Sequence, residues 1–159
     1  MTLCVRLATT RDFHAMAALF AEVDAIHIDN HPERFRSPGQ PPRALDYLEQ
    51  VLASPHQVFL VAELEGRLTG LVHVAVYEAP AIPLFVPRLT AVVSDLVVAE
   101  EHRSHGIGQR LLSEAESWAR LHGASTLELS VYEFNTGARR FYEGAGYGTL
   151  SRMMSKQLR

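Results

Sequence analysis

The sequence predicts an α/β fold of the mixed α+β kind, with a mostly antiparallel central sheet, one parallel strand pair and helices on both faces. Three observations predict it. Runs that alternate apolar and polar residues recur between segments with helical spacing. A short connection containing glycine joins two β-rich runs, as in an antiparallel hairpin. A strand, a helix and a strand follow one another over residues 89–131, which makes those two strands parallel neighbours.

Local patterns define the elements of the first half. Thr9, with Asp12 three residues later, is typical of a helix N-terminus, and Ser54-Pro55 ends a second helix. The many prolines and polar residues between the two helices predict a loop. The expected elements are a strand at residues 5–7, a helix at 13–20, a loop at 24–42 and a helix at 45–52.

The second half begins with the hairpin, which closes over Leu64 to Arg67. Three prolines in residues 79–87 predict an exposed crossing to the next strand. Gly123 is placed to terminate a helix that starts at Ile107, and Asn135 can cap the last helix. The expected elements are strands at residues 58–63, 68–78, 89–98 and 127–131, helices at 107–122 and 136–142, and a final strand from Tyr147 onward.

Composition narrows the class of protein. The chain has 159 residues, of which 47% are hydrophobic. We therefore expect a single domain, residues 1–159, with a substantial core. The formal charge of -3 argues against nucleic acid as a partner. Cys4 is the only cysteine, so an internal disulfide and a cysteine-based metal cluster are excluded. No apolar run approaches the ~20 residues of a membrane span, and we expect no membrane partner and a cytoplasmic location.

The segment with the clearest chemistry is Arg103-Ser104-His105-Gly106-Ile107-Gly108, which lies between a strand and a helix. The first turn of a helix leaves backbone N–H groups unpaired and carries the positive end of the helix dipole, and both attract a phosphate. Gly106 and Gly108 leave room for a diphosphate near the backbone. Leu111 stands where a dinucleotide fingerprint needs its third glycine, and the Gly-Lys-Ser/Thr end of a P-loop is missing. The segment therefore predicts a binding site for a nucleotide-like anion that is neither a dinucleotide-binding fingerprint nor a P-loop.

Further residues bring a resemblance to a known family. Leu96-Val97-Val98, the Arg-x-x-Gly-x-Gly turn, and Asn135 with Phe141 to Tyr147 resemble successive signature segments of the GNAT N-acetyltransferase superfamily. The resemblance in element order spans nearly the whole chain. It implies that acetyl-CoA is the co-substrate, that no metal is needed and that the parallel strands splay apart at the cofactor. The cofactor-binding residues that it implies are Leu96, Val97, Val98, Arg103, Ser104, His105, Gly106, Ile107, Gly108, Gln109, Asn135 and Tyr142.

Acetyl transfer from a thioester to an amine needs a proton acceptor, because an alkyl amine with a pKa near ~10.4 arrives as an ammonium ion. Asp95 is the first candidate for that base, although it could instead order a loop or water. His73, Glu78 and water itself stay open as alternatives. By the resemblance, the backbone N–H of Val98 stabilises the thioester oxyanion and Tyr142 is the general acid that protonates the thiolate. Tyr142 could otherwise be a core residue.

The acceptor and the partners are less defined. The resemblance assigns Ala21 to Arg36 to recognition of a primary amine on a small molecule or a peptide. His27 and His31 lack a third ligand at a metal-site spacing. Non-catalytic binding of acyl-CoA and acetylation of protein N-termini are the alternative functions, and both a monomer and a homodimer agree with the sequence. The segment from Ala21 to Arg36 also contains four acidic residues, which would either attract a cationic amine or simply form a solvated surface: Glu22, Asp24, Asp29 and Glu33.

Overall fold

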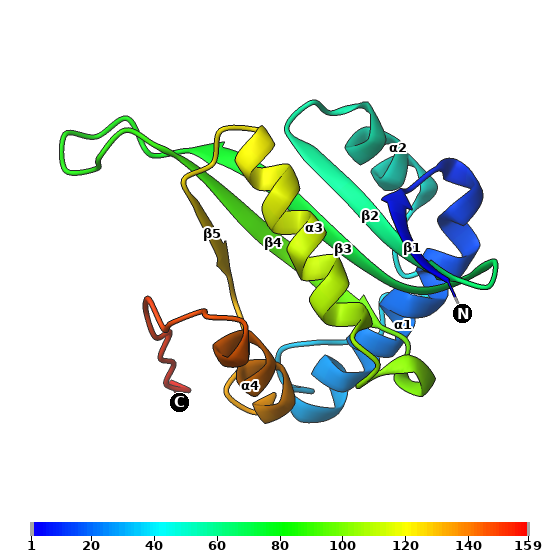
Figure 1. Ribbon diagram of the computed structural model, residues 1–159. Coiled ribbons are helices and arrows are strands. Elements are labelled where there is room, and N and C mark those ends of the chain that lie inside the picture. Colours follow the sequence, from blue (N-terminus) through cyan, green and yellow to red (C-terminus); the bar gives the residue numbers. More distant parts are fainter. Residues whose placement is uncertain (1, 159) are drawn as a thin grey trace.

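The structure, a computed structural model, describes residues 2–158. Its centre is a five-stranded sheet in the order β1-β2-β3-β4-β5 (Figure 1). All neighbouring strands are antiparallel except β4 and β5, which are parallel, so the predicted mixed sheet is confirmed. The strands are β1 (Leu3–Leu7), β2 (Gln57–Leu64), β3 (Arg67–Glu78), β4 (Leu89–Val98) and β5 (Thr126–Leu129). The helices are α1 (Phe13–Asn30), α2 (Leu45–Ala53), α3 (Ile107–Leu121) and α4 (Thr136–Gly144), with short 3-10 turns at Thr10–Asp12 and Glu100–His102.

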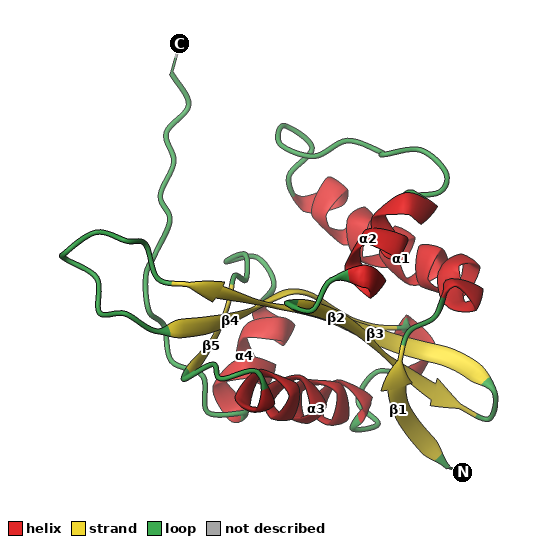
Figure 2. Cartoon of the chain, turned by 90° about the horizontal axis from the view of Figure 1, so that it is seen from above, coloured by secondary structure: helices red, strands yellow, loops and turns green. Residues whose placement is uncertain are grey.

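Helices cover both faces of the sheet (Figure 2). α1 and α2 lie on one face, and α3 lies on the other. Because successive residues of a strand point to opposite faces, Leu71 belongs to the core beneath α1 and α2, whereas Val72 belongs to the core beneath α3. β3 is therefore buried on both sides, which explains its nearly continuous apolar sequence.

The loop predicted over residues 24–42 is wrong in its first part, because α1 continues to Asn30. Two polar side chains bond back to the preceding turn: His27 Nδ1 lies 2.8 Å from the carbonyl oxygen of Val23, and Asn30 Nδ2 donates to Ile26. All the prolines of this stretch lie beyond the helix, and Pro32 disfavours a helical backbone for the residue before it. The helix therefore ends at Asn30, just before the residue whose backbone Pro32 restricts.

The final strand predicted from Tyr147 is also wrong. Residues 147–158 adopt no regular structure, and the tail leaves the body of the protein (Figure 2). A β-prone sequence becomes a strand only beside another strand, and within residues 2–158 the edge strand β5 pairs with β4 alone. The apolar side chains of the tail stay exposed: Leu150, Met153, Met154 and Leu158.

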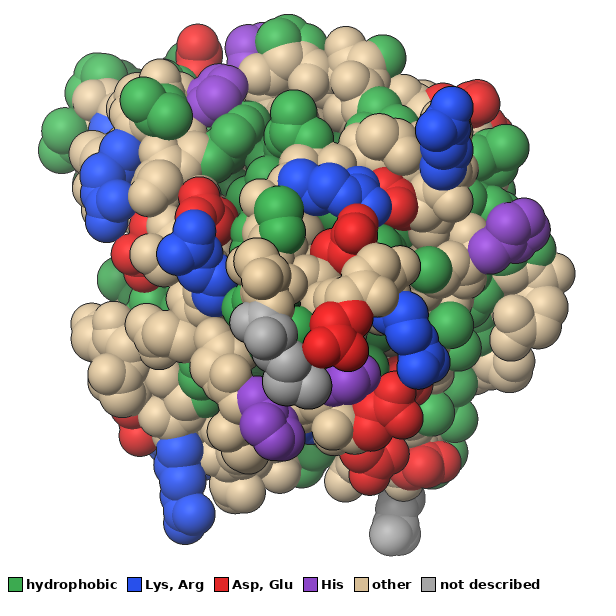
Figure 3. Space-filling model, turned by 45° about the vertical axis from the view of Figure 1, so that its right-hand side comes forward, with side chains coloured by type: hydrophobic (Ala, Val, Ile, Leu, Met, Phe, Trp, Pro, Cys, Tyr) green, Lys and Arg blue, Asp and Glu red, His purple; other side chains and the backbone are tan. Residues whose placement is uncertain are grey.

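The surface mixes charges of both signs. Acidic and basic side chains are interspersed on the face shown in Figure 3. Apolar side chains of the β3–β4 crossing are also exposed, including Leu84 and Val86. Within residues 2–158, no helix combines the length and the apolar character that a membrane crossing requires.

Gly70 determines how closely α3 approaches the sheet. A Cβ atom added at Gly70 would lie 2.8 Å from the carbonyl oxygen of Val97 and 2.9 Å from Leu111 Cδ1. The leucine can adjust its side chain, but the carbonyl belongs to the neighbouring strand and cannot move without disturbing the sheet. Any larger residue here would push β3 away from β4 and α3.

We predict that Gly70→Ala lowers the free energy of unfolding by about 1–3 kcal/mol, the usual cost of overpacking a core. Gly144→Ala is the matched control, since Gly144 lies in α4 with nothing within 4 Å of the added methyl group. That control should keep or slightly raise stability, because alanine favours a helix. Denaturant unfolding of both variants measures the difference, and equal midpoints would contradict the argument.

Candidate active site

A cavity of about 510 Å³ opens where β4 and β5 separate. The parallel pairing of the two strands stops at Val93 and Leu129, so β5 ends two residues before the predicted strand end at Val131. Residues 93–96 of β4 form one wall of the cavity. The second wall consists of residues 129–132, at and just after the end of β5, together with residues of α4. The end of α1 and the loop after it form the third wall.

A β-bulge turns Asp95 toward this cavity. His73 of β3 is opposite Asp95, but the next residue, Val74, is opposite Val93, so Ser94 is an extra residue in β4. Such a bulge changes the direction of the side chains near it. The Asp95 side chain is 21% exposed and lines the cavity. Burial raises the pKa of Asp95 above its ordinary value, and the positive charge of Arg43 offsets part of that rise.

His73 lies behind Asp95, outside the cavity lining. Its ring stacks on Phe59 at a centroid distance of 4.5 Å, and burial lowers its pKa to about 4, so it is neutral at pH 7. His73 Nε2 lies 3.0 Å from Gln57 Oε1, which places the proton of the neutral ring on that nitrogen. Nδ1 is buried, has no hydrogen-bond partner among residues 2–158 and lies 3.9 Å from Asp95 Oδ2. It can therefore accept a proton or a hydrogen bond from the carboxyl group.

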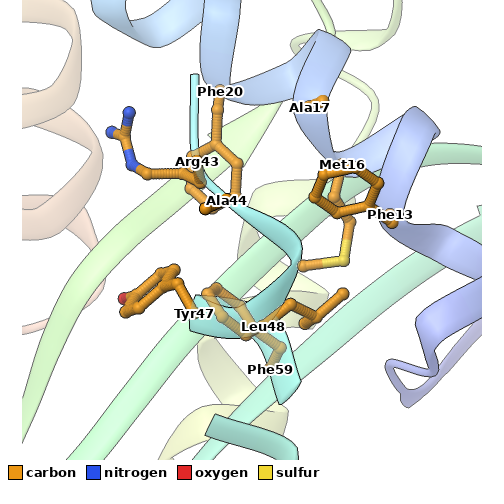
Figure 4. A pocket seen from close by; sticks show the side chains of 9 residues that line it. All are labelled: Phe13, Met16, Ala17, Phe20, Arg43, Ala44, Tyr47, Leu48 and Phe59. Atoms are coloured by element: carbon orange, nitrogen blue, oxygen red, sulfur yellow. The ribbon is translucent and has the colours of Figure 1, made fainter. Parts of the chain in front are cut away.

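A second carboxylate in the cavity, Asp24, is already neutralised. Arg43 donates two hydrogen bonds to it, at 2.8 and 2.9 Å. The same guanidinium lies 4.8 Å from the centre of the Phe20 ring. Figure 4 shows Arg43 at the border of a small core void of about 10 Å³ between α1, α2 and β2, whose other side chains are mostly apolar. That void is part of the core, so Arg43 separates the core from the functional cavity.

Three aromatic rings form a wall of the cavity. His27, Phe35 and Tyr132 come from α1, the following loop and the segment after β5. Each pair meets edge to face at centroid distances of 5.4 to 5.6 Å. Phe134 stacks on Tyr132 from outside at 5.7 Å. These contacts join α1 to the β5–α4 connection and fix the rings in place.

The glycine turn leads directly into α3, as predicted. Gly106 is the N-cap residue with φ of 80°, and Ser104 also has a positive φ, of 63°. The helix therefore begins with free N–H groups beside a backbone without bulky side chains. A Cβ at Gly108 would lie 3.4 Å from Phe141, so this glycine lets α4 approach α3.

Arg103 is exposed, but contacts restrain its side chain. Its Nε donates to the carbonyl oxygen of Val98 at 3.0 Å, and its guanidinium lies 3.7 Å from Glu22. His105 Nδ1 lies 2.6 Å from the carbonyl oxygen of Arg103. The turn is thus tied to the end of β4, next to the part of that strand that β5 leaves unpaired.

Tyr142 and Asn135 enter the cavity from the side of α4. Asn135 caps that helix as predicted, because its side chain accepts a hydrogen bond from the N–H of Ala138. Burial raises the pKa of Tyr142 to about 12, so the phenol keeps its proton throughout the neutral range. The Tyr142 ring meets Phe141 edge to face at 5.2 Å.

The predicted site residues fall into three groups. Asp95, Leu96, Asn135 and Tyr142 line the same cavity. Val97, Val98 and the glycine turn continue from its edge without lining it. Glu78 pairs with Leu89 at the opposite end of β4, so it lies away from the cavity. The segment predicted to recognise the acceptor contains His27 and Phe35 of the aromatic wall, but sequence reasoning missed Tyr132 and Arg43. The Tyr-x-Phe spacing at Tyr132 was the only local signal for that residue.

Comparison with known proteins identifies the family. The model of the Acetyltransferase (GNAT) family matches residues 20–147, and the chain belongs to this family. The uncharacterised N-acetyltransferase YhfO of Bacillus subtilis is 30% identical over 143 residues, which cover 90% of this chain and 88% of YhfO. The resemblance found in the sequence is thereby confirmed.

Solved structures share the whole fold. The tetramutant of the BH1408 protein from Bacillus halodurans has a TM-score of 0.92 at 27% identity and covers 98% of this chain and 99% of its own. The aminoglycoside N-acetyltransferase AAC(6')-Iy, in complex with CoA, has a TM-score of 0.79 at 13% identity, with coverage of 99% and 95%. These neighbours confirm the predicted GNAT fold.

The charges of the cavity predict how Asp95 titrates. We expect Arg43→Met to raise the pKa of Asp95 further, because it removes a nearby positive charge and leaves Asp24 unpaired. Carboxyl carbon NMR during a pH titration measures this shift. Arg110→Met on α3, where the arginine pairs with Glu114, is the control and should leave the pKa of Asp95 unchanged. A lower or unaltered pKa in Arg43→Met would contradict this description of the cavity.

Proposed function

We propose that residues 1–159 form one catalytic domain that transfers the acetyl group of acetyl-CoA to a primary amine of a small molecule or a peptide. The observation that carries the proposal is the shared cavity: a partly buried carboxyl, Asp95, and a protonated phenol, Tyr142, face it from opposite sides of the opening between β4 and β5. Both substrates would bind together, and the amine would attack the thioester directly.

The strand and the glycine turn are suited to hold coenzyme A, which supplies the activated acetyl group. The part of β4 beyond Val93 has no partner in β5, so its backbone can pair with an extended amide-containing arm. The free N–H groups at the start of α3 can bind a diphosphate, and Gly106, where an added Cβ would meet nothing within 4 Å, leaves the backbone accessible. A GNAT neighbour solved with CoA supports this assignment.

Asp95 is the base that the geometry favours. It can take a proton from the incoming ammonium group directly or through water, and it alone among the three candidate side chains lines the cavity. His73 touches the reaction only through Asp95. Burial raises the pKa of Asp95 above the ordinary aspartate value of ~3.9. We therefore expect kcat/KM to fall as the pH drops through this raised pKa, because the base becomes protonated.

Tyr142 serves the departing thiolate. As the new N–C bond forms and the C–S bond breaks, the sulfur gains negative charge that a phenol can stabilise by a hydrogen bond or by its proton. A pKa of about 12 makes complete proton transfer from Tyr142 to the thiolate uphill, because the conjugate thiol has a pKa near ~8.5. Hydrogen bonding therefore contributes much of the effect. The backbone N–H of Val98 is the proposed donor to the thioester oxygen.

The cofactor site can be tested with two glycines of similar geometry. Gly106 and Gly66 have φ of 80° and 78°, and a methyl group on either meets nothing within 4 Å. Alanine at either position should therefore cost similar stability. We predict that only Gly106→Ala weakens CoA binding, by about tenfold or more, because only its methyl group stands where a phosphate approaches α3. Calorimetric titration of both variants decides, and equal affinities would refute the diphosphate site.

The chemical role of Tyr142 has a separate test. We expect Tyr142→Phe to lower kcat about 100-fold, in the range usual for loss of a general acid, while CoA affinity stays within a few fold. Tyr77→Phe, at an exposed tyrosine of β3, should retain full activity. A thiol-release assay with an amine panel measures both. Undiminished release would remove Tyr142 from the mechanism, and tight CoA binding without release from any amine would favour a non-catalytic acyl-CoA-binding module.

A further inference from the structure

The cavity divides into two parts of different character. The part between β4, β5 and α4 belongs to the thioester under the proposed function. The remaining part lies between the end of α1 and the loop that leads to α2, and it includes Asp24, His27, Phe35, Arg36 and Arg43. Only this second part can recognise the body of the acceptor, so its charges and surfaces define the acceptor class.

Three of the four acidic residues of α1 and the following loop are already paired, and the fourth, Asp29, is exposed and does not line the cavity. Asp24 is held by Arg43 through two hydrogen bonds. Glu22 accepts from the N–H of Glu100 at 3.0 Å, and Glu33 lies 2.8 Å from His31 Nδ1. These acids therefore add little attraction for a cation, contrary to what their clustering in the sequence suggests.

Asp95 is the exception. No side chain among residues 2–158 donates a hydrogen bond to its carboxyl group, and His73 presents an acceptor nitrogen to it. Arg36 lines the opposite part of the cavity as an exposed cation without an ion pair in the described chain. One unpaired acid and one unpaired cation in the same cavity suit a single ammonium group and oppose a second one.

The aromatic wall supplies the other half of the recognition. His27, Phe35 and Tyr132 present ring surfaces, and apolar Val23 and Ile28 extend the wall. The rings are held by their mutual edge-to-face contacts, so they do not need to be ordered when a ligand binds. Such a wall binds flat or apolar groups better than a heavily hydroxylated sugar, whose polar groups would lose water without finding partners.

We propose that the acceptor is a primary amine with a single positive charge on an aromatic body. Its ammonium group faces Asp95, and its ring lies against His27, Phe35 and Tyr132. This inference rests on the proposed function. It separates the chain from its aminoglycoside-acetylating neighbours, because a polycation meets only one unpaired acid in this cavity and the charge of Arg36 opposes it.

The test compares 2-phenylethylamine, spermidine and an aminoglycoside as acceptors in the thiol-release assay with acetyl-CoA. We expect kcat/KM for 2-phenylethylamine to exceed that of either polycation at least tenfold. Tyr132→Ala should raise the KM for 2-phenylethylamine about tenfold with CoA affinity unchanged. Tyr77→Ala is the control outside the cavity and should alter neither value.

A variant with a gain of activity guards against misfolding as an explanation. Arg36→Glu replaces the unpaired cation with a second acid, and we expect it to raise kcat/KM for spermidine at least fivefold. A preference of the wild-type protein for spermidine or the aminoglycoside would overturn the acceptor class but leave the acetyltransferase intact. If the protein binds CoA but releases thiol with none of the three amines, the proposed acceptor class is also wrong. If it releases thiol with no amine of a wider panel, the proposed function is wrong too.

Discussion

The site depends on the loss of pairing between two parallel strands. β4 and β5 pair from Thr90 to Val93 and then separate, because Ser94 adds a residue to β4 and β5 ends at Leu129. Buried backbone groups need partners, so an opening of this kind inside a sheet is unfavourable unless a ligand or water fills it. The opening creates the cavity, turns Asp95 into it and lets α4 bring Tyr142 to its other side. The remaining elements hold these edges in place.

Burial determines the protonation states of Asp95, Tyr142 and His73, which lie in or directly behind the cavity. Desolvation disfavours the charged form, so it raises the pKa of both the Asp95 carboxyl and the Tyr142 phenol and lowers that of His73. The consequences differ with the starting value. Tyr142 stays a proton donor, and His73 stays a neutral acceptor behind the carboxyl. Arg43 offsets part of the effect on Asp95 and thereby favours the ionised form that a base requires.

Sequence patterns predicted what depends on local chemistry. The hairpin, the helix that follows the glycine turn and the Asn135 cap each follow from a few neighbouring residues, and all are present. The Asp24–Arg43 pair and the contact of His27 with Tyr132 join residues far apart in the chain, so no spacing rule could reveal them. The predicted last strand failed for the same reason: a strand exists only with a neighbour, and its own sequence does not specify one.

The two halves of the cavity therefore differ in how far sequence can describe them. The sheet, the turn and α4 carry the features that define a GNAT protein, and those features are local patterns that a family model matches. The proposed acceptor side is built from the end of α1, which extends into the predicted loop, and from the loop after it. A change of a few residues there can alter the charge and shape of the wall without disturbing the strands. The cavity residues of the sheet and α4 and those of α1 and the loop after it are thus physically separate sets, and only the second requires side-chain positions to be known.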